Sequence, residues 1–501
     1  MAVGLGRAGP AALAREWPAR LPGAHAAVGV VAIAAGLVVG YLVAQDLSVF
    51  RVALMGAAMA LAPVLLLNLD VAAVAFPAFL WARVSDVGIT EQGLPSLAVP
   101  FALGLLGIAL GRRLLAGERI GLATFGGLLP VLPYVGVVVA SIAWSAFPDR
   151  ALGTAAGLVK DVLIFWVIAE TLRRPPALKA GLYGLILAVA GLSVVSLHQY
   201  VTGDFGSSYG GFAQAEVRQI IDEVNANRPG GPIGDPNFFA QILLVTLPLG
   251  FALLRTRLQP VARVVLGLCL PLIGLTTLLT FSRGGALILP LVLVLSLARY
   301  RIGLAQLLTA AVVLIGVALA APPSVWERVG TIVRPFGEQR ELGQVIDASV
   351  DLRLSAQRVA LEMFADHPFL GVGASNYPPL YQEYARRLGV SSVAGEFFPH
   401  NLYLEILAET GAIGLLAFLP VAFGPLLGLI RARRAAPPHA SEDHDWHELA
   451  YGIELALVAY LLASLLLHGS YPRYLWILLA LAVAALAQAP GSNRPATLVP
   501  P

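Results

Sequence analysis

The chain has 501 residues, of which 58% are hydrophobic and only 13% are charged. A soluble domain carries about 25% charged residues, so this composition excludes an ordinary globular enzyme. The formal net charge is only +3, and the basic residues stand in short segments between apolar runs, which argues against nucleic acid as a partner.

Long apolar runs recur between residues 27 and 489. A bilayer core about 30 Å thick requires roughly 20 apolar residues per helix, and many of the runs approach that length. Membrane-spanning strands would alternate polar and apolar residues, whereas these runs are apolar on all sides. The sequence therefore predicts an all-α polytopic membrane protein, a bundle of 12–14 transmembrane helices with a large helical extracytoplasmic loop.

The first expected span follows a short basic segment that has no convincing cleavage site, so we expect it to stay uncleaved. The second and third runs are short and form either two spans or one re-entrant hairpin. The single cysteine, Cys269, lies inside an apolar run, so no intramolecular disulfide is possible. In chain order the expected spans are 27–45, 51–68, 69–83, 97–111, 121–145, 151–172, 179–199, 233–254, 263–281, 284–298, 303–321, 401–430, 448–469 and 472–489.

Arginine and lysine alternate between the connecting segments, and basic segments remain on the cytoplasmic side of a membrane. The basic connections are 112–119, 173–179, 255–263, 299–301 and 431–434. The connections between them carry at most one basic residue each, so we expect both termini in the cytoplasm. Segments 200–232 and 322–400 then face outside.

The expected organisation has five parts. They are a cytoplasmic segment (1–26), about eleven spans with an outer loop at 200–232 (27–321), a large outer loop (322–400), the last three spans (401–489) and a cytoplasmic tail (490–501). Within the large loop, residues 351–366 have the apolar spacing of a helix. We expect this helix to be amphipathic and to lie along the membrane face.

Three groups are expected at similar depth on the outer face: Arg283, Arg353 and His400. Guanidinium groups match phosphate oxygens in pairs and keep their charge, and a neutral histidine suits removal of a proton from a hydroxyl. Cations that bind a departing diphosphate replace a metal ion, so no metal and no cofactor are expected. Each residue has a plainer alternative: a snorkelling arginine, a solvated helix face and a structural histidine.

Several weaker candidates extend this site. Asn237 either contacts substrate or caps a helix, and capping is the favoured interpretation. Glu405 and Glu409 are one helical turn apart inside a span, where carboxylates are costly, so they either orient the arginines or bind a distant helix. The remaining weak candidates for binding the substrate are Arg358, His468 and Arg473.

Six motifs follow one another along the chain. They are AWSAFPDRAL (143–152), GDPNFFAQ (234–241), FSRGG (281–285), RLSAQRVALEMFADHPFLGVG (353–373), HNLYLEILAETGAIG (400–414) and HGSYPRYLW (468–476). In this order, around one long loop before the last three spans, they resemble the bacterial O-antigen ligase and O-antigen polymerase family of membrane glycosyltransferases. The resemblance covers most of residues 120–489, whereas residues 1–115 match in hydropathy alone.

The resemblance implies a glycan donor on undecaprenyl diphosphate and metal-independent, inverting transfer to an acceptor hydroxyl. It places the reaction on the outer face of the bacterial cytoplasmic membrane, in O-antigen, exopolysaccharide or capsule biosynthesis. It identifies Arg283 and Arg353 as the essential arginines and His400 as the catalytic histidine. Gln357 departs from the family pattern, because many relatives carry a tryptophan there.

Two alternatives concern the acceptor and the class of protein. A polymerase uses another lipid-linked glycan as the acceptor, whereas a ligase uses the lipid A core or a protein. Both need the same donor site. A transporter of lipid-linked oligosaccharides would also be polytopic. Transporters of that kind usually show internal repeats and a site at the bilayer midplane, neither of which this sequence shows.

Overall fold

The computed structural model describes residues 69–115, 127–219, 225–299, 343–390, 392, 395–436, 443–469 and 473–490. The expected N-terminal segment, three expected spans (27–45, 51–68 and 303–321) and nearly all of the C-terminal tail lie outside the described residues.

The described part of the chain is almost entirely helical, and the exception is a two-stranded antiparallel hairpin of β1 (Gln214–Gln219) and β2 (Asn225–Gly231). The helices are α4 (Leu69–Trp81), α5 (Val84–Gln92), α6 (Ala98–Leu115), α7 (Leu132–Ala140), α8 (Pro148–Thr171), α9 (Pro175–Thr202), α10 (Pro236–Arg255), α11 (Pro260–Leu279), α12 (Arg283–Leu297), α15 (Gly343–Asp366), α16 (Tyr377–Leu388), α17 (Leu402–Ala435), α18 (His444–Ala463) and α19 (Arg473–Leu486).

Within the described residues, five helices are long and apolar enough to cross a membrane: α8, α9, α10, α11 and α17. All except α17 begin with a proline in the first turn, where the missing N–H costs no helical hydrogen bond. The prediction of an all-α polytopic membrane protein is confirmed.

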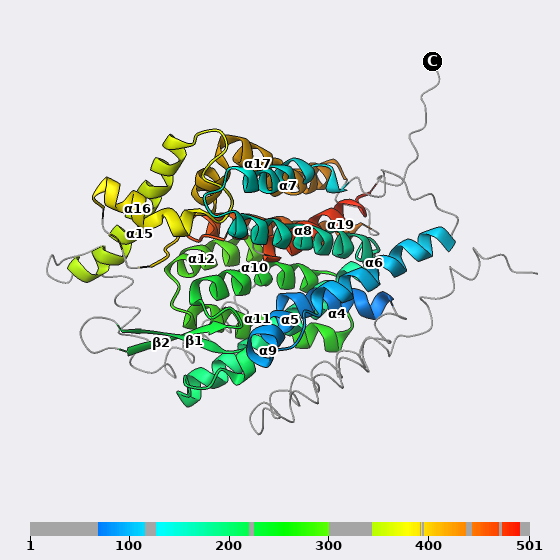
Figure 1. The fold of residues 1–501 in the computed structure, drawn as a ribbon. Coiled ribbons are helices and arrows are strands. Elements are labelled where there is room, and N and C mark those ends of the chain that lie inside the picture. Colours follow the sequence, from blue (N-terminus) through cyan, green and yellow to red (C-terminus); the bar gives the residue numbers. More distant parts are fainter. Residues whose placement is uncertain are drawn as a thin grey trace, which may run out of the picture.

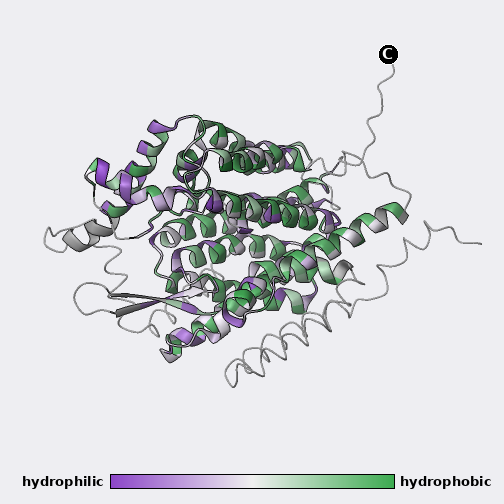
Figure 2. Cartoon of the chain, in the orientation of Figure 1, coloured by the Kyte–Doolittle hydropathy of each residue, from purple (hydrophilic) through white to green (hydrophobic). Residues whose placement is uncertain are grey.

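Figure 1 shows the long helices running side by side, with α15, α16 and the β1–β2 hairpin gathered at one end of the bundle. Hydrophobic residues dominate the long helices, whereas hydrophilic residues gather in α15 and α16 (Figure 2). We call the end that carries α15, α16 and the hairpin the polar end of the bundle. It is formed by the two segments that the basic-residue pattern predicts to lie outside.

Helix α10 lies at the centre of the bundle, and its sequence shows how it comes to be enclosed. It packs against α9, α11, α12 and α18. Glycines make two of these contacts close, because a Cβ on Gly250 would overlap Leu270 of α11 and a Cβ on Gly452 of α18 would overlap Ala252. Small residues let helices in a membrane approach until their backbones nearly touch.

Ion pairs join the helices at the end of the bundle opposite the polar end. The buried Glu448 of α18 accepts hydrogen bonds from Arg255 of α10 (2.7 Å) and from Arg299, which follows α12 (2.9 Å). Lys179 of α9 pairs with Asp445 of α18 at 2.8 Å. A carboxylate buried with two guanidinium groups avoids the large cost of an unpaired buried charge, so these pairs hold α18 against three neighbours.

At the polar end, the segment after α15 crosses a break in α17. Gly411 interrupts α17 with φ 66° and ψ −168°, which leaves nearby backbone groups without helical partners. The crossing segment supplies those partners. Its hydrogen bonds run from Val372 N to Ala408 O (3.0 Å), from Gly373 N to Glu409 O (2.9 Å), from Ala412 N to Pro368 O (2.9 Å) and from Ile413 N to Phe369 O (3.3 Å).

Glycines permit this crossing. A Cβ on Gly411 would overlap the backbone of Phe369, and a Cβ on Gly371 would overlap the backbone of Glu409. Both glycines also have positive φ, which other residues adopt only at a cost. The motifs HPFLGVG and ETGAIG are therefore two halves of one joint, which fixes α15 to α17.

Glu409 extends the joint to α16. Its buried carboxylate accepts hydrogen bonds from Ser375 N (2.7 Å) and Tyr377 N (3.3 Å) at the start of that helix. Negative charge is favourable there, because the first N–H groups of a helix have no partner within it.

Helix α15 confirms the helical spacing predicted for 351–366, but its apolar face is occupied within the protein. Val359 and Met363 are fully buried in a cluster with Tyr377 and Tyr381 of α16 and with Ala408 of α17. From residue 351 onward, where the side chains are described, the large hydrophobic residues of this helix that are exposed are Leu354 and Leu361.

Candidate active site

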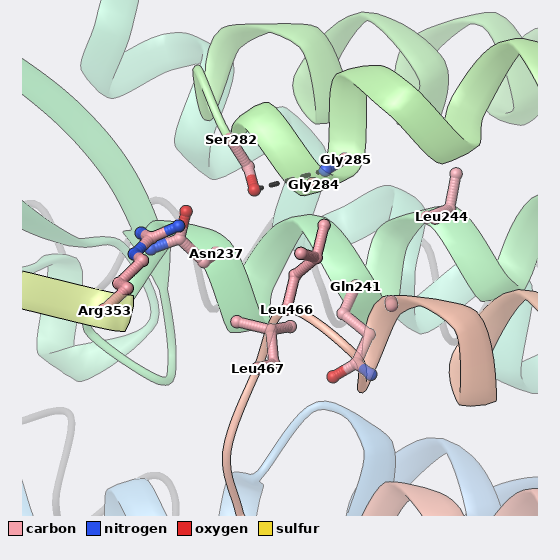
Figure 3. A pocket seen from close by; sticks show the side chains of 10 residues that line it. Asn237, Gln241, Leu244, Ser282, Gly284, Gly285, Arg353, Leu466 and Leu467 are labelled. Carbon is pink, nitrogen blue, oxygen red and sulfur yellow. Dashed lines mark hydrogen bonds between the residues drawn. The ribbon is translucent and has the colours of Figure 1, made fainter. Parts of the chain in front are cut away.

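A pocket lies at the polar end, between the starts of α10 and α12, the side of α15 and the end of α18 (Figure 3). One part of its lining is polar and the other is apolar. The lining residues are Asn237, Gln241, Leu244, Ser282, Gly284, Gly285, Arg353, Ala463, Leu466 and Leu467.

The start of α10 directs Asn237 towards this pocket. Asp235 is the N-cap, and its carboxylate accepts from the N–H groups of Asn237 (2.7 Å) and Phe238 (3.2 Å). The favoured interpretation of Asn237 as the cap is thus wrong. The side chain of Asn237, in the first turn, accepts a hydrogen bond from Arg228 of β2 at 3.1 Å and lines the pocket.

The FSRGG motif forms the turn into α12. Ser282 caps the helix by accepting from Gly285 N at 3.3 Å, and Phe281 before it has a left-handed backbone with φ 50°. The glycines bring the turn close to its neighbours, because a Cβ on Gly285 would lie 3.1 Å from Ala240 and one on Gly284 would lie 3.3 Å from Leu466.

Arg283 is the first residue of α12, and its side chain is exposed, with no ion pair or hydrogen bond to a described residue. The structure places it beside the pocket but not in its lining. Arg353 is half-buried and lines the pocket directly. Arg358 is exposed on the same helix and lies outside the lining.

His400 stands directly before α17, and that start is fixed to the end of α18. Asn401 caps α17 by accepting from the N–H groups of Tyr403 and Leu404, both at 3.0 Å, and donates to Leu465 O at 3.2 Å. His400 itself has φ 48°, which is unusual for a residue other than glycine and recurs at functional sites.

The structure brings His468 against His400, with ring centres 5.0 Å apart and planes crossing at 85°. His468 also stacks on Phe398, with ring centres 4.1 Å apart, and meets the edge of Phe238. Its pKa falls to about 3, because burial disfavours the charged form and because His400 and Arg353 are nearby. His468 is therefore neutral at physiological pH.

Glu405 fixes the segment that carries His468. Its buried carboxylate accepts a hydrogen bond from Gly469 N at 2.7 Å. Gly469 has φ 101°, so only glycine suits this position. The two glutamates expected near the arginines thus both bind backbone N–H groups that shape the polar end, one beside His468 and the other at the start of α16.

Arg473 lies away from the pocket lining and is paired with two carboxylates. It donates to Asp86 of α5 (2.9 Å) and to Asp161 of α8 (3.3 Å). Asp161 stands near the middle of α8, so α19 begins partway along that helix rather than at its outer end. The pairing offsets the cost of placing these charges inside the bundle.

Sequence reasoning missed Arg228, which is buried in the segment 200–232. Its Nε donates to Thr280 O at 2.9 Å, directly before the FSRGG turn, and its Nη2 donates to Asn237. The sequence feature that could have identified Arg228 is its position in a glycine-rich segment, six residues before the GDPN motif.

The fold and this pocket define a polytopic membrane protein with a cationic site at one end of its helical bundle. Residues 268–419 match the family model described as O-Antigen ligase, and this stretch contains Arg283, Arg353 and His400. The chain thus carries an O-antigen ligase domain, and the family predicted from its motifs is confirmed. A search of curated proteins found no match.

Proposed function

We propose that the protein transfers a glycan from undecaprenyl diphosphate to an acceptor hydroxyl on the outer face of a bacterial cytoplasmic membrane. Four features of the pocket support this proposal: the half-buried Arg353, the FSRGG turn, the adjoining His400–His468 pair and the leucines of the apolar part of the lining. A diphosphate between a sugar and a polyprenyl chain needs cations at one end and apolar surface at the other.

The proposed chemistry needs two separate roles. His400 accepts the proton of the acceptor hydroxyl while the hydroxyl oxygen attacks the anomeric carbon in line. The bond between that carbon and the diphosphate oxygen breaks, the configuration inverts, and the undecaprenyl diphosphate leaves with the bonding electrons. Arg283 and Arg353 bind the diphosphate as its negative charge grows, which is where preorganised cations contribute most.

The neutral His468 fits these roles. A second imidazolium beside His400 would oppose the positive charge that His400 gains when it takes up the proton. Because burial holds the pKa of His468 at about 3, no such repulsion arises at physiological pH. The arginines then provide the fixed positive charge of the site.

The roles are separated by measuring donor affinity and single-turnover transfer for variants in nanodiscs. We expect His400→Ala to bind the donor normally and to lose about a hundredfold or more in turnover, the usual contribution of a general base. Arg353→Ala and Arg283→Lys should weaken donor binding about tenfold or more, since hydrogen bonds to charged groups are lost.

Three results would contradict the proposal. Wild-type transfer by His400→Ala would remove His400 as the base. Normal binding and turnover in both arginine variants would place the diphosphate site elsewhere. Loss of transfer in excess EDTA, restored by magnesium or manganese, would require a metal ion in place of the arginines.

A further inference from the structure

Asn237 carries a side-chain amide whose orientation is fixed by its partner. Arg228 has only N–H donors, so the Asn237 atom that it contacts at 3.1 Å must be the carbonyl oxygen Oδ1. The amide nitrogen Nδ2 is therefore the atom left over, and it makes no hydrogen bond to a described residue. Asn237 lines the pocket, and Figure 3 shows its amide beside the Arg353 guanidinium.

Arg228 is well suited to hold this orientation. Only 8% of its surface is exposed, and Thr280 O fixes its Nε at 2.9 Å. It thereby joins β2 to the first turn of α10, which lines the pocket, and to Thr280 at the end of α11. A guanidinium held at two points has little freedom to release Asn237.

The result is a pair of donors that face one space. Asn237 Nδ2 and the Arg353 guanidinium both line one end of the pocket, and neither group can accept a hydrogen bond. A phosphate oxygen that enters this end of the pocket can accept a hydrogen bond from each of them. The adjacent start of α12 adds the partial positive charge of a helix N-terminus.

We propose that Asn237 is a direct diphosphate-binding residue and that Arg228 is the positioning residue that turns the Asn237 amide N–H₂ group towards the substrate. The proposal rests on the function proposed above and adds two residues to its donor site. According to this proposal, Arg228 affects binding because it orients Asn237, and not because its own charge contacts the diphosphate.

A double-mutant cycle tests this assignment, with undecaprenyl diphosphate itself as the probe and the full chain in nanodiscs. Asn237→Ala should weaken binding about tenfold. Asn237→Asp should weaken it by a further factor, since the isosteric carboxylate retains the oxygen for Arg228 but presents negative charge to the diphosphate. Arg228→Gln should weaken binding about as much as Asn237→Ala, and the double variant should lose less than about twofold more. Arg386→Gln, an exposed arginine on α16, is the matched control and should bind as the wild type does.

The outcomes separate this inference from the proposed function. If Arg353→Ala weakens binding but Asn237→Asp does not, Asn237 is no ligand and the inference fails alone. If Arg228→Gln and Asn237→Ala are additive, Arg228 acts independently and its positioning role is wrong. If Arg353→Ala also binds normally, the diphosphate site of the proposed function fails. The folded fraction of each variant is measured by thermal unfolding, and affinities are compared at equal concentrations of folded protein. A destabilised variant therefore still gives a result.

Discussion

The imidazole rings of His400 and His468 meet edge to face with their centres 5.0 Å apart, although 67 residues separate them in the chain. The contact depends on two attachments. The start of α17 is tied to the end of α18, where Leu402 N donates to Ser464 O at 2.9 Å, and Glu405 binds Gly469 N.

The burial of His468, together with its contact with His400, predicts a pH dependence of stability. The pKa of His468 is about 3 in the folded protein against 6.5 when free, so folding favours the neutral form. The contribution of His468 to the free energy of unfolding is present in full above about pH 6.5. It is lost as the pH falls towards 3, by up to about 1.4 kcal/mol for each pH unit. Thermal unfolding in nanodiscs between pH 7 and pH 4 should therefore show a smaller loss for His468→Phe, which keeps the ring stacking, than for the wild type. Parallel curves would contradict the prediction.

The joint between α15 and α17 predicts a contrast between two glycines that lie within helices. Gly411→Ala should destabilise the protein by about 2 kcal/mol or more, because its Cβ would overlap the Phe369 backbone and its φ is 66°. Gly191→Ala of α9 is the matched control, since Gly191 is exposed and, apart from its own helical backbone and chain neighbours, no atom lies within 4 Å of the added Cβ. It should leave stability unchanged or raise it slightly. The unfolding temperatures of the two variants are measured in the same detergent. Equal temperatures would show that a side chain fits at position 411.

The pairing of Arg473 predicts a loss of stability rather than of donor affinity. Arg473→Ala leaves Asp86 and Asp161 without their shared partner, and breaking a buried ion pair in this way costs about 3–5 kcal/mol. Adding Asp161→Asn to that variant should recover part of the loss, because one uncompensated charge disappears. Thermal unfolding and affinity for undecaprenyl diphosphate, measured together, test this. Weakened affinity without a change in unfolding would instead place Arg473 at the phosphate site.

The basic-residue pattern predicts which side each loop faces. In a Cys269→Ala background, single cysteines at positions 210 and 390 should react with an impermeant reagent in intact cells, whereas one at position 440 should not. Labelling at position 440 before lysis would overturn the predicted orientation.

The apolar runs predicted the long helices well because a helix in lipid must satisfy its own backbone, which makes its length a local property. The runs 151–172 and 263–281 correspond to α8 and α11 within a few residues. Their starts were placed slightly late, since each begins at a proline that stands before the apolar run. The same proline rule identifies Asp235, directly before Pro236, as the cap of α10.

The site was less predictable because its contacts join distant segments. Motif order indicated Arg353 and His400, but it gave no sign that Arg228 holds Asn237 or that Arg473 pairs with Asp161. Such pairings depend on how the helices pack, and a single sequence contains no direct record of that packing.

The crossing at Gly411 also determines where insertions or deletions can occur without changing the spacing between Arg353 and His400. Arg353 lies on α15 about four turns before the joint, and His400 directly precedes α17, about three turns before the joint. Two helices and their junction therefore set the spacing between Arg353 and His400. The segment between Leu388 and Phe397 belongs neither to α15 or α17 nor to their junction. Insertions or deletions there would leave the spacing between Arg353 and His400 untouched. The architecture therefore allows this loop to change in length without altering how far Arg353 lies from His400.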